Sequence, residues 1–218
     1  MPGIASAVSE QAYGEYLAGL VAGDRICCAS IVQGLCAAGA GVKDLYLNLF
    51  QRALYRIGEL WEQHQASVAL EHLATAITER LLTLVQSQVF SAPSRNRSVI
   101  ISCVAGEFHQ LGGRMVADLF EMHGWRAYFL GANTPLDGLL EMIDALKPDL
   151  LGLSLTISSN LPLLLPVLDA VTTAHPGLPI LVGGQAFCSG DTDTFERYPG
   201  VTRIASIDDL ERAMAAHD

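Results

Sequence analysis

The second half of the chain alternates short apolar runs with segments of helical periodicity. The run from Ser98 to Val104 is apolar almost without interruption and rich in β-branched residues, which is typical of a strand buried on both faces. The expected strands lie near 98–104, 126–130, 150–155, 179–182 and 201–204, and the expected helices near 111–123, 135–146, 161–175 and 206–216. This alternation predicts a doubly wound, five-stranded parallel sheet.

The first part of the chain shows helical periodicity only. Apolar residues recur at helical spacing in four segments, near 8–22, 24–38, 42–64 and 67–90. Asp24 and Ser67 stand where N-caps are expected. A short polar segment around Pro93 then has the composition of a linker. We therefore predict a four-helix bundle over residues 1–92, followed by a Rossmann- or flavodoxin-like α/β domain over residues 97–218.

The composition limits the classes of function. Half of the 218 residues are hydrophobic, which is enough for one large core or two small ones. The formal net charge is −10, so direct binding to nucleic acid is not expected, because that attraction needs a basic face. Neither a secretory signal pattern nor an apolar run of membrane-spanning length is present, so we expect a soluble, cytoplasmic protein that does not bind membranes. The five cysteines contain no C-x-x-C pair and fit buried thiols in a reducing compartment.

A histidine lies in the loop that leaves the first expected strand. The loop reads GEFHQLG over Gly106–Gly112, and open α/β sheets bind ligands at the carboxyl ends of their strands. An isolated loop histidine most often bonds only to nearby backbone. Two further loops fall at the same edge of the sheet, one at Ser154 with several hydroxyls after it and one at Gly183-Gly184. Taken singly, these residues fit a strand end and a tight turn; together with His109 they outline one elongated slot.

These residues resemble the signature of the cobalamin-binding domain family, which reads D-x-H-x-x-G, then S-x-L, then G-G. His109 and Gly112 match the first element, Ser154 the second and Gly183-Gly184 the third, and 41 residues separate Gly112 from Ser154. In that family the histidine replaces the cofactor's own dimethylbenzimidazole as the lower cobalt ligand. The freed nucleotide tail runs into a channel lined by the other two loops. The resemblance, which covers roughly residues 97–216, therefore implies that His109 binds cobalt.

The chain departs from that signature at two positions. Glu107 replaces the aspartate, and Thr156, with 26 residues between it and Gly183, replaces the leucine. A carboxylate that accepts the second N–H of a metal-bound imidazole fixes its tautomer and raises its basicity. Glu107 offers such a carboxylate with one more methylene of reach, and Thr156 adds a hydroxyl to the tail channel.

The helical segment carries a second pattern, a tryptophan followed after nine residues by Glu-His. Trp61 stands at the end of one expected helix and Glu71-His72 in the first turns of the next. The residues alone fit a core tryptophan, a glutamate that complements a helix N-terminus and a solvated histidine. The pattern also resembles the cap of CarH-type cobalamin photoreceptors, in which a four-helix bundle covers the adenosyl group of adenosylcobalamin. It implies that Trp61 packs on the adenosyl group and that Glu71 and His72 contact it or the corrin.

Those photoreceptors also carry glutamate at the first position of the histidine loop, so the resemblance implies a light-sensing regulatory protein rather than an enzyme. Light breaks the cobalt–carbon bond in that family, and the bundle rearranges. We therefore expect a light-dependent homo-oligomer, a dimer or larger, and a protein partner such as a transcription factor or effector domain. The histidine that binds the exposed cobalt in that family is replaced here by Glu62, and His64 is the nearest substitute. The helix-turn-helix domain of such repressors has no counterpart in the pattern, so we expect a module that does not bind DNA.

Other roles remain open. A corrinoid carrier in methyl transfer shares the two-domain plan but generally lacks the tryptophan cap. A cobalamin storage or chaperone protein would use the same cofactor residues. A sensor with a second chromophore such as a bilin is compatible, although no cysteine has an evident attachment context. An enzyme with its own active site is least expected, because no nucleophile and base stand together beside the slot.

Overall fold

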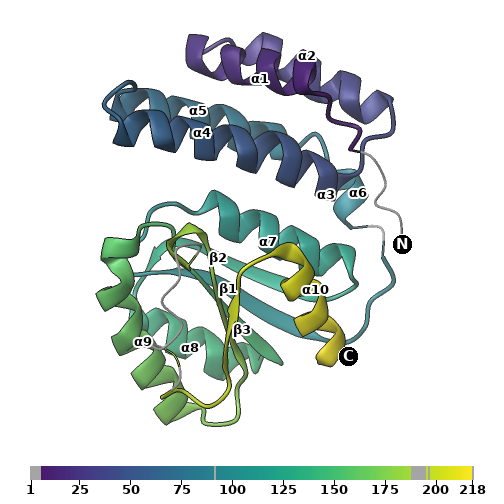
Figure 1. Cartoon of the computed structure of the whole chain (residues 1–218). Coiled ribbons are helices and arrows are strands. Elements are labelled where there is room, and N and C mark those ends of the chain that lie inside the picture. The colour runs from purple at the N-terminus through teal and green to yellow at the C-terminus, as the bar shows by residue number, and fades with distance from the viewer. Residues whose placement is uncertain (1–5, 91, 188–194, 196, 218) are drawn as a thin grey trace. The chain divides into compact units, whose positions relative to one another are not determined.

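The chain folds into two compact units, one helical and one built around a sheet (Figure 1). The computed structural model describes residues 6–90, 92–187, 195 and 197–217. The boundary between the units falls between Ser91 and Ala92. Within the described ranges, no helix is both long and apolar enough to cross a bilayer.

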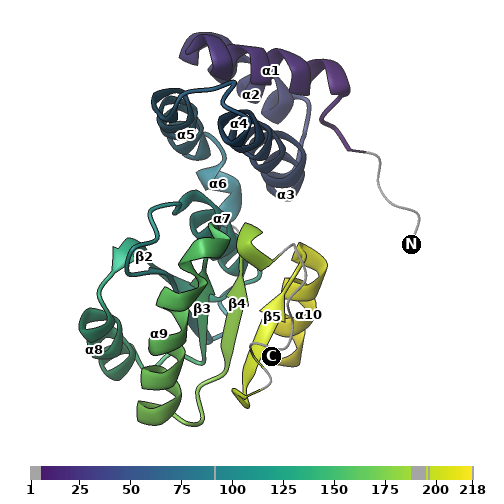
Figure 2. The ribbon, with the colours of Figure 1, turned by 60° about the vertical axis from the view of Figure 1, so that its left-hand side comes forward.

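The helical unit packs α1 beside α2 and α4 beside α5 (Figures 1 and 2). Its elements are α1 (Glu10–Ala22), α2 (Arg25–Ala37), α3 (Val42–Asp44), the π-helical η1 (Leu45–Gln51), α4 (Arg52–Glu62), α5 (Val68–Leu82) and α6 (Gln86–Val89). The carboxylate of Asp24 and the hydroxyl of Ser67 accept hydrogen bonds from first-turn amides, so both predicted N-caps are confirmed. A four-helix architecture results, with α3, η1 and α4 forming its third member.

The fourth helix is shorter than the sequence predicts. α5 ends at Leu82 rather than continuing to residue 90, and the short α6 follows after a turn. At this point the Thr83 hydroxyl donates to the carbonyl of Arg80 at 2.7 Å.

The second unit is a five-stranded, all-parallel sheet in the order β2-β1-β3-β4-β5. The predicted doubly wound α/β fold is therefore confirmed, with the flavodoxin-like strand order. The strands are β1 (Ser98–Val104), β2 (Arg126–Thr134), β3 (Leu150–Ser154), β4 (Ile180–Gly183) and β5 (Val201–Ile204); the helices are α7 (Leu111–Met122), α8 (Leu136–Leu146), α9 (Leu161–Ala174) and α10 (Ile207–Ala216), with 3-10 turns η2 (Ser158–Asn160) and η3 (Gln185–Phe187).

Helices cover both faces of the sheet, α7 and α10 on one and α8 and α9 on the other (Figures 1 and 2). Alternate residues of β1 serve the two cores: Ile100 packs toward α8 and α9, whereas Val99 and Ile101 pack toward α7 and α10. Burial on both faces explains why the strands are apolar throughout. The sheet can therefore expose ligand-binding groups only at its edges, in the loops.

β2 extends to Thr134, four residues beyond its predicted end. Its pairing with β1 shifts register near Ile101 and Ser102, and Gly131 in this stretch has φ +82°. The irregularity lets the strand continue to the carboxyl edge of the sheet, where Thr134 pairs with Val104. α8 then begins at Leu136, with Pro135 as its N-cap residue rather than inside its first turn.

The buried hydrogen bond between Tyr16 and Thr78 predicts a measurable contribution to the stability of the helical unit. The two hydroxyls lie 2.9 Å apart and both residues are fully buried. We expect Tyr16→Phe to lower the free energy of unfolding by about 1 to 2 kcal/mol, because the Thr78 hydroxyl loses its partner. Urea denaturation followed by circular dichroism measures this. Tyr13→Phe is the matched control, since the Tyr13 ring stacks under Arg52 and keeps that contact; equal losses in the two variants would contradict the assignment.

Candidate functional site

The three loops singled out by the sequence meet at the carboxyl edge of the sheet. β1 and β3 are adjacent although they are not consecutive, so the strand order reverses between them. Ser154, at the end of β3, pairs with Cys103 of β1 on one side and with Gly183 of β4 on the other. The histidine loop follows directly after β1. These residues therefore surround the topological switch point, where open α/β sheets bind their ligands.

Glu107 is the buried centre of this edge. Its side chain is fully buried, and its Oε1 accepts hydrogen bonds from Nδ1 of His109 at 2.6 Å and from the backbone N–H of His109 at 2.9 Å. Its Oε2 accepts from the backbone N–H groups of Thr156 and Ile157, at 3.0 and 3.3 Å. One carboxylate thus joins the loop after β1 to the loop after β3.

The hydrogen bonds keep this buried carboxylate ionised. Burial opposes ionisation, but the donors from the His109 ring, the His109 amide and the amides of Thr156 and Ile157 together lower the pKa of Glu107 from 4.5 to about 2. An ionised acceptor at Nδ1 fixes the imidazole tautomer in which Nδ1 carries the proton and Nε2 the lone pair. The side chain of His109 is 39% exposed, so part of the ring is open to solvent.

Cys103 lies beneath the same loop without chemical activation. Its thiol contacts the carbonyl oxygen of His109 at 3.8 Å. Burial, reinforced by the charge of Glu107, raises the pKa of the Cys103 thiol to about 12. A thiol in this state is not nucleophilic near neutral pH, so Cys103 serves to pack the loop.

Hydrogen bonds from β2 hold the histidine loop in place, and the sequence did not predict them. The side-chain oxygen of Asn133 accepts from the N–H of Gly106 at 2.8 Å, and the N–H of Asn133 donates to the carbonyl of Glu107 at 2.8 Å. The side-chain oxygen of Gln110 accepts from the N–H of Ala132 at 3.1 Å. Asn133 has φ +52°, a conformation that asparagine tolerates better than most residues. An asparagine just before Thr134-Pro135 was therefore the sequence feature that could have indicated a turn-like backbone here.

Gly112, Gly183 and Gly184 of the family signature differ in how closely other atoms approach them. Gly112 is exposed in the first turn of α7, and a Cβ built there would meet nothing within 4 Å. Gly184 has φ +119°, and a Cβ there would lie 2.2 Å from the carbonyl oxygen of Leu155. The backbone of Leu155 therefore requires a glycine at position 184, whereas no contact among the described residues requires one at position 112. Gly183 would place a Cβ 3.4 Å from the carbonyl of Ile204, an ordinary contact.

The residues between Ser154 and the start of α9 present polar groups beside the histidine loop. Ser154 and Thr156 are half-buried, and Ser158 and Ser159 are exposed. The Thr156 amide is engaged by Glu107 through the backbone, which the replacement of leucine by threonine does not alter. Phe108, between Glu107 and His109, is 67% exposed.

The other predicted site residues lie in the helical unit. Trp61 is in the last turn of α4 and is 39% exposed, so the interpretation of Trp61 as a core residue is wrong. Glu71 is in the first turn of α5 and His72 follows it; Glu71 accepts from the Thr75 hydroxyl at 3.0 Å, and His72 is exposed. His64 adopts φ +58° in the turn that ends α4.

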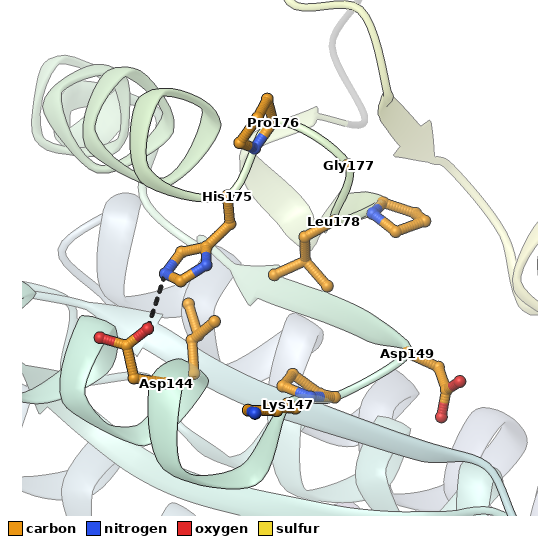
Figure 3. A pocket seen from close by; sticks show the side chains of 10 residues that line it. Asp144, Lys147, Asp149, His175, Pro176, Gly177 and Leu178 are labelled. Carbon is orange, nitrogen blue, oxygen red and sulfur yellow. Dashed lines mark ion pairs between the residues drawn. The ribbon is translucent and has the colours of Figure 1, made fainter.

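A hollow of about 510 Å³ lies at the opposite, amino edge of the sheet (Figure 3). His175 and Asp144 face one another there, with Nε2 and Oδ1 3.7 Å apart. Asp149, at its rim, is engaged by Arg97 and by the amide of Ser98. The hollow is thus formed by loops that precede the strands, and none of the predicted cofactor residues lines it.

The donor set at the switch point fits a metal that brings its own ligands. Among the residues that the structure describes, no three His, Cys, Asp or Glu side chains converge as a free metal ion would require. A single imidazole oriented by a buried carboxylate is instead suited to the one open axial position of a metal already held by a macrocycle.

Comparison with known proteins identifies the family. Residues 97–208 match the model of the B12 binding domain. A second B12 binding domain model matches residues 13–86, within the helical unit. The chain therefore belongs to the B12 binding domain family, and both units take part in the match.

The chain is similar to proteins of two classes, transcriptional repressors and corrinoid proteins. The HTH-type transcriptional repressor CarH of Myxococcus xanthus is 34% identical over 60% of this chain, and the match covers 43% of that repressor. The trimethylamine corrinoid protein 1 of Methanosarcina acetivorans is 24% identical over 63% of this chain and 65% of its own length. The chain thus spans less than half of the repressor that it matches.

A solved structure shares the whole fold. The monomethylamine corrinoid protein of Methanosarcina barkeri superposes with a TM-score of 0.79 over 95% of this chain and 99% of its own, at 14% identity. This likeness shows the fold of a helical part followed by a Rossmann-like domain. The residues present at the switch point fit cobalamin as the ligand: a lone carboxylate-backed imidazole, open space at Gly112 and an exposed aromatic at Phe108.

The lowered pKa of Glu107 predicts a loss of stability in acid. The folded-state pKa lies below the unfolded value, so the stabilisation is complete above about pH 4.5 and is lost as the pH falls toward 2. The shift corresponds to about 3 kcal/mol. Urea denaturation at a series of pH values, followed by Trp125 fluorescence in a Trp61→Phe background, reports on the sheet unit. Glu107→Gln should flatten the pH dependence, whereas the surface control Glu141→Gln should not; parallel curves for all three proteins would contradict this.

The open space at Gly112 predicts opposite effects of one substitution on stability and on binding. Gly112→Ala should stabilise the cobalamin-free protein by about 0.5 to 1 kcal/mol, because alanine is the better helix former and meets no atom. If a cofactor lies against this position, its affinity should fall about tenfold or more. Gly138→Ala in α8, where a Cβ also meets nothing, is the matched control. Absorbance titration with aquacobalamin measures the affinity; unchanged affinity in Gly112→Ala would exclude the contact.

Proposed function

We propose that this protein is a cobalamin-binding light sensor with a regulatory output, in which His109 is the lower axial ligand of cobalt. The observation that carries the proposal is the fully buried Glu107 carboxylate, which holds Nδ1 of His109 at 2.6 Å at the β1/β3 switch point. The relationship to the repressor CarH supports the regulatory role. Adenosylcobalamin is the proposed form of the cofactor, and it supplies a cobalt–carbon bond that visible light breaks.

The sheet unit holds the cofactor in this proposal. Glu107 keeps Nδ1 of His109 protonated and so presents the lone pair of Nε2. Gly112 leaves room at the start of α7, and Ser154, Thr156 and Gly183-Gly184 line the channel for the nucleotide tail. The ionised state of Glu107 raises the basicity of the imidazole, which strengthens it as a ligand.

The helical unit supplies the response. Trp61, Glu71 and His72 are the residues that we propose to contact the adenosyl group or the corrin, and the exposed ring of Trp61 is available for such a contact. The match of residues 13–86 to a B12 binding domain model supports a cofactor role for this unit. His64 is the candidate for a second cobalt ligand after illumination. A change in the unit's packing would alter a homo-oligomer or the binding of a partner such as a transcription factor.

Illumination of the loaded protein tests this function. We expect protein loaded with adenosylcobalamin in the dark to lose the adenosyl spectrum under green light and to change its elution volume on a sizing column, because the groups that contacted the adenosyl moiety must repack. Trp61→Ala should retain the cofactor but reduce the change in elution volume. His64→Ala should alter the spectrum of the illuminated protein only if His64 becomes a ligand.

His109→Ala should weaken adenosylcobalamin binding about tenfold or more and change the dark spectrum, because the axial nitrogen is lost. His123→Ala is the matched control, since His123 is 35% exposed and bonds the carbonyl of Leu119 within the same unit. A photostable loaded protein would overturn light sensing, and a spectrum unaffected by His109→Ala would overturn the ligand assignment. An additional absorption band, absent from free cobalamin, would instead indicate a second chromophore such as a bilin.

A corrinoid carrier in methyl transfer is the second candidate. The observation that favours it is the match to the trimethylamine corrinoid protein, which covers 65% of that protein against 43% of the repressor. A carrier would hold cobalamin with the same His109 and Glu107 but would pass a methyl group to and from a methyltransferase. Transfer from methylcobalamin-loaded protein to a methyltransferase in the dark, with no change in elution volume under light, would favour this candidate.

A further inference from the structure

The helices α1 and α2 are almost uncharged. Their charged residues are Glu10, Glu15 and Arg25, whereas the shorter α4 carries four charged side chains in 11 residues. A helix at the surface of a globular protein normally directs charged and polar residues outward. α1 and α2 therefore differ from ordinary surface helices.

Apolar side chains lie on the outer side of these two helices as well as on the inner side. Tyr16 of α1 and Cys28 of α2 are fully buried, because α4 and α5 pack against the inner side (Figures 1 and 2). On the outer side, Val21 is 46% exposed and Ile26 is 70% exposed. A helix that is apolar on all sides is typical of one that is covered on all sides.

The exposed residues of α1 and α2 recur every three or four positions, so they share one side of each helix. We call this surface the α1–α2 outer face; it comprises Gly14, Ala18, Val21, Ala22, Ile26, Ser30, Gln33, Gly34 and Ala37. Leu73 of α5, which is 45% exposed, adjoins it, since a Cβ at Gly23 would lie 3.1 Å from Cδ2 of Leu73. The face is therefore continuous across the turn between the two helices.

The size of the outer face suits a small protein–protein interface. Two adjacent helices of 13 residues each cover roughly 20 by 25 Å, or ~500 Å², when their side chains and the turn are included. A specific dimer takes about 600 to 1000 Å² of surface from each copy. The face thus corresponds to an interface at the small end of that range, which is typical of reversible association.

The charge of the chain indicates which partner this face suits. The net charge is −10, so two copies repel each other wherever their acidic surfaces meet. On the outer face of α1 and α2 almost no charge opposes their approach. A basic partner would instead be attracted to the acidic surface elsewhere and would gain little here. A near-neutral face therefore favours a second copy of the chain.

The charged residues beside the face are arranged for pairing between two copies. Glu15 lies in the second turn of α1, and Arg25 begins α2 beside the opposite end of α1. Glu10 is already engaged, because both of its oxygens accept from Arg52, at 2.7 and 2.8 Å. A two-fold axis through the middle of the face would bring Glu15 of each copy toward Arg25 of the other.

We propose that the α1–α2 outer face is a dimer interface, on which a second copy of this chain packs about a two-fold axis. The dimer forms in the cofactor-free protein in the dark, so it does not rest on the proposed function. Its dissociation constant is on the order of 10 μM, because the face is small. Since α4 and α5 pack against the inner side of the same helices, a rearrangement of the bundle would reach this interface.

Sedimentation velocity of the cofactor-free protein tests the interface. We expect the average mass to rise from one chain to two as the concentration increases from about 1 to about 200 μM. Ile26→Glu and Ala18→Glu should each weaken the dimer about tenfold or more, because each would bury an unpaired charge. Leu163→Glu is the matched control, since Leu163 is 44% exposed on α9 of the other unit. Circular dichroism should show the same helix content in all four proteins.

A charge exchange tests the two-fold pairing. Glu15→Arg alone and Arg25→Glu alone should each weaken the dimer several-fold, because like charges then face each other across the axis. The double variant should recover dimerisation. A mixture of the two single variants, one of them carrying an amino-terminal dye, should form a heterodimer, because one copy then supplies two arginines and the other two glutamates. Recovery on mixing is expected of a second copy and not of an unrelated partner.

Each contrary outcome overturns a defined part of the inference. A protein that stays monomeric over the whole concentration range would overturn the dimer. A dimer that Ile26→Glu and Ala18→Glu leave intact would overturn the placement on the outer face, and failure of the mixed variants to associate would overturn the two-fold pairing. A dimer that passes these tests in a photostable loaded protein would refute the light sensor alone. A monomer whose elution volume still responds to light would refute the dimer alone.

Discussion

The site depends on one buried carboxylate that is kept ionised by four N–H donors. Glu107 lies at the point where the sheet's strand order reverses, and the free energy of its hydrogen bonds exceeds the cost of removing its charge from water. Because its partners come from the loops after β1 and β3, the carboxylate fixes both the histidine and the neighbouring channel loop. Without it, the imidazole would lose its preferred tautomer and the two loops their shared anchor.

The parallel sheet makes this arrangement available. Strands buried on both faces leave polar chemistry only at their ends, and the β2-β1-β3 order places two such ends side by side. β2 contributes beyond its hydrogen-bonded pairing, since Asn133 holds the backbone at Gly106 and Glu107. The histidine loop is thus supported from β2 on one side and from β3 on the other, while the ring of His109 stays accessible.

The sequence predicted the fold well because buried strands and amphipathic helices have distinct periodicities. It predicted the strands of the sheet, the N-caps at Asp24 and Ser67, and the positions that identify the family. It could not predict contacts that depend on three-dimensional pairing. The extension of β2 to Thr134 requires a register shift, and the close approach of the Leu155 backbone excludes a side chain at Gly184. The second oxygen of Glu107 likewise finds partners 49 and 50 residues away, which no local pattern encodes.

The central claim is that a nitrogen of His109, oriented by Glu107, binds cobalt. Electron paramagnetic resonance of protein loaded with cob(II)alamin measures this directly, because a nitrogen in the axial position splits the cobalt lines. In protein labelled with ¹⁵N-histidine, the account predicts that each line changes from a triplet to a doublet, and that His109→Ala abolishes the change. A triplet that persists in the labelled protein would show that the axial nitrogen comes from the cofactor's own base and would contradict the account.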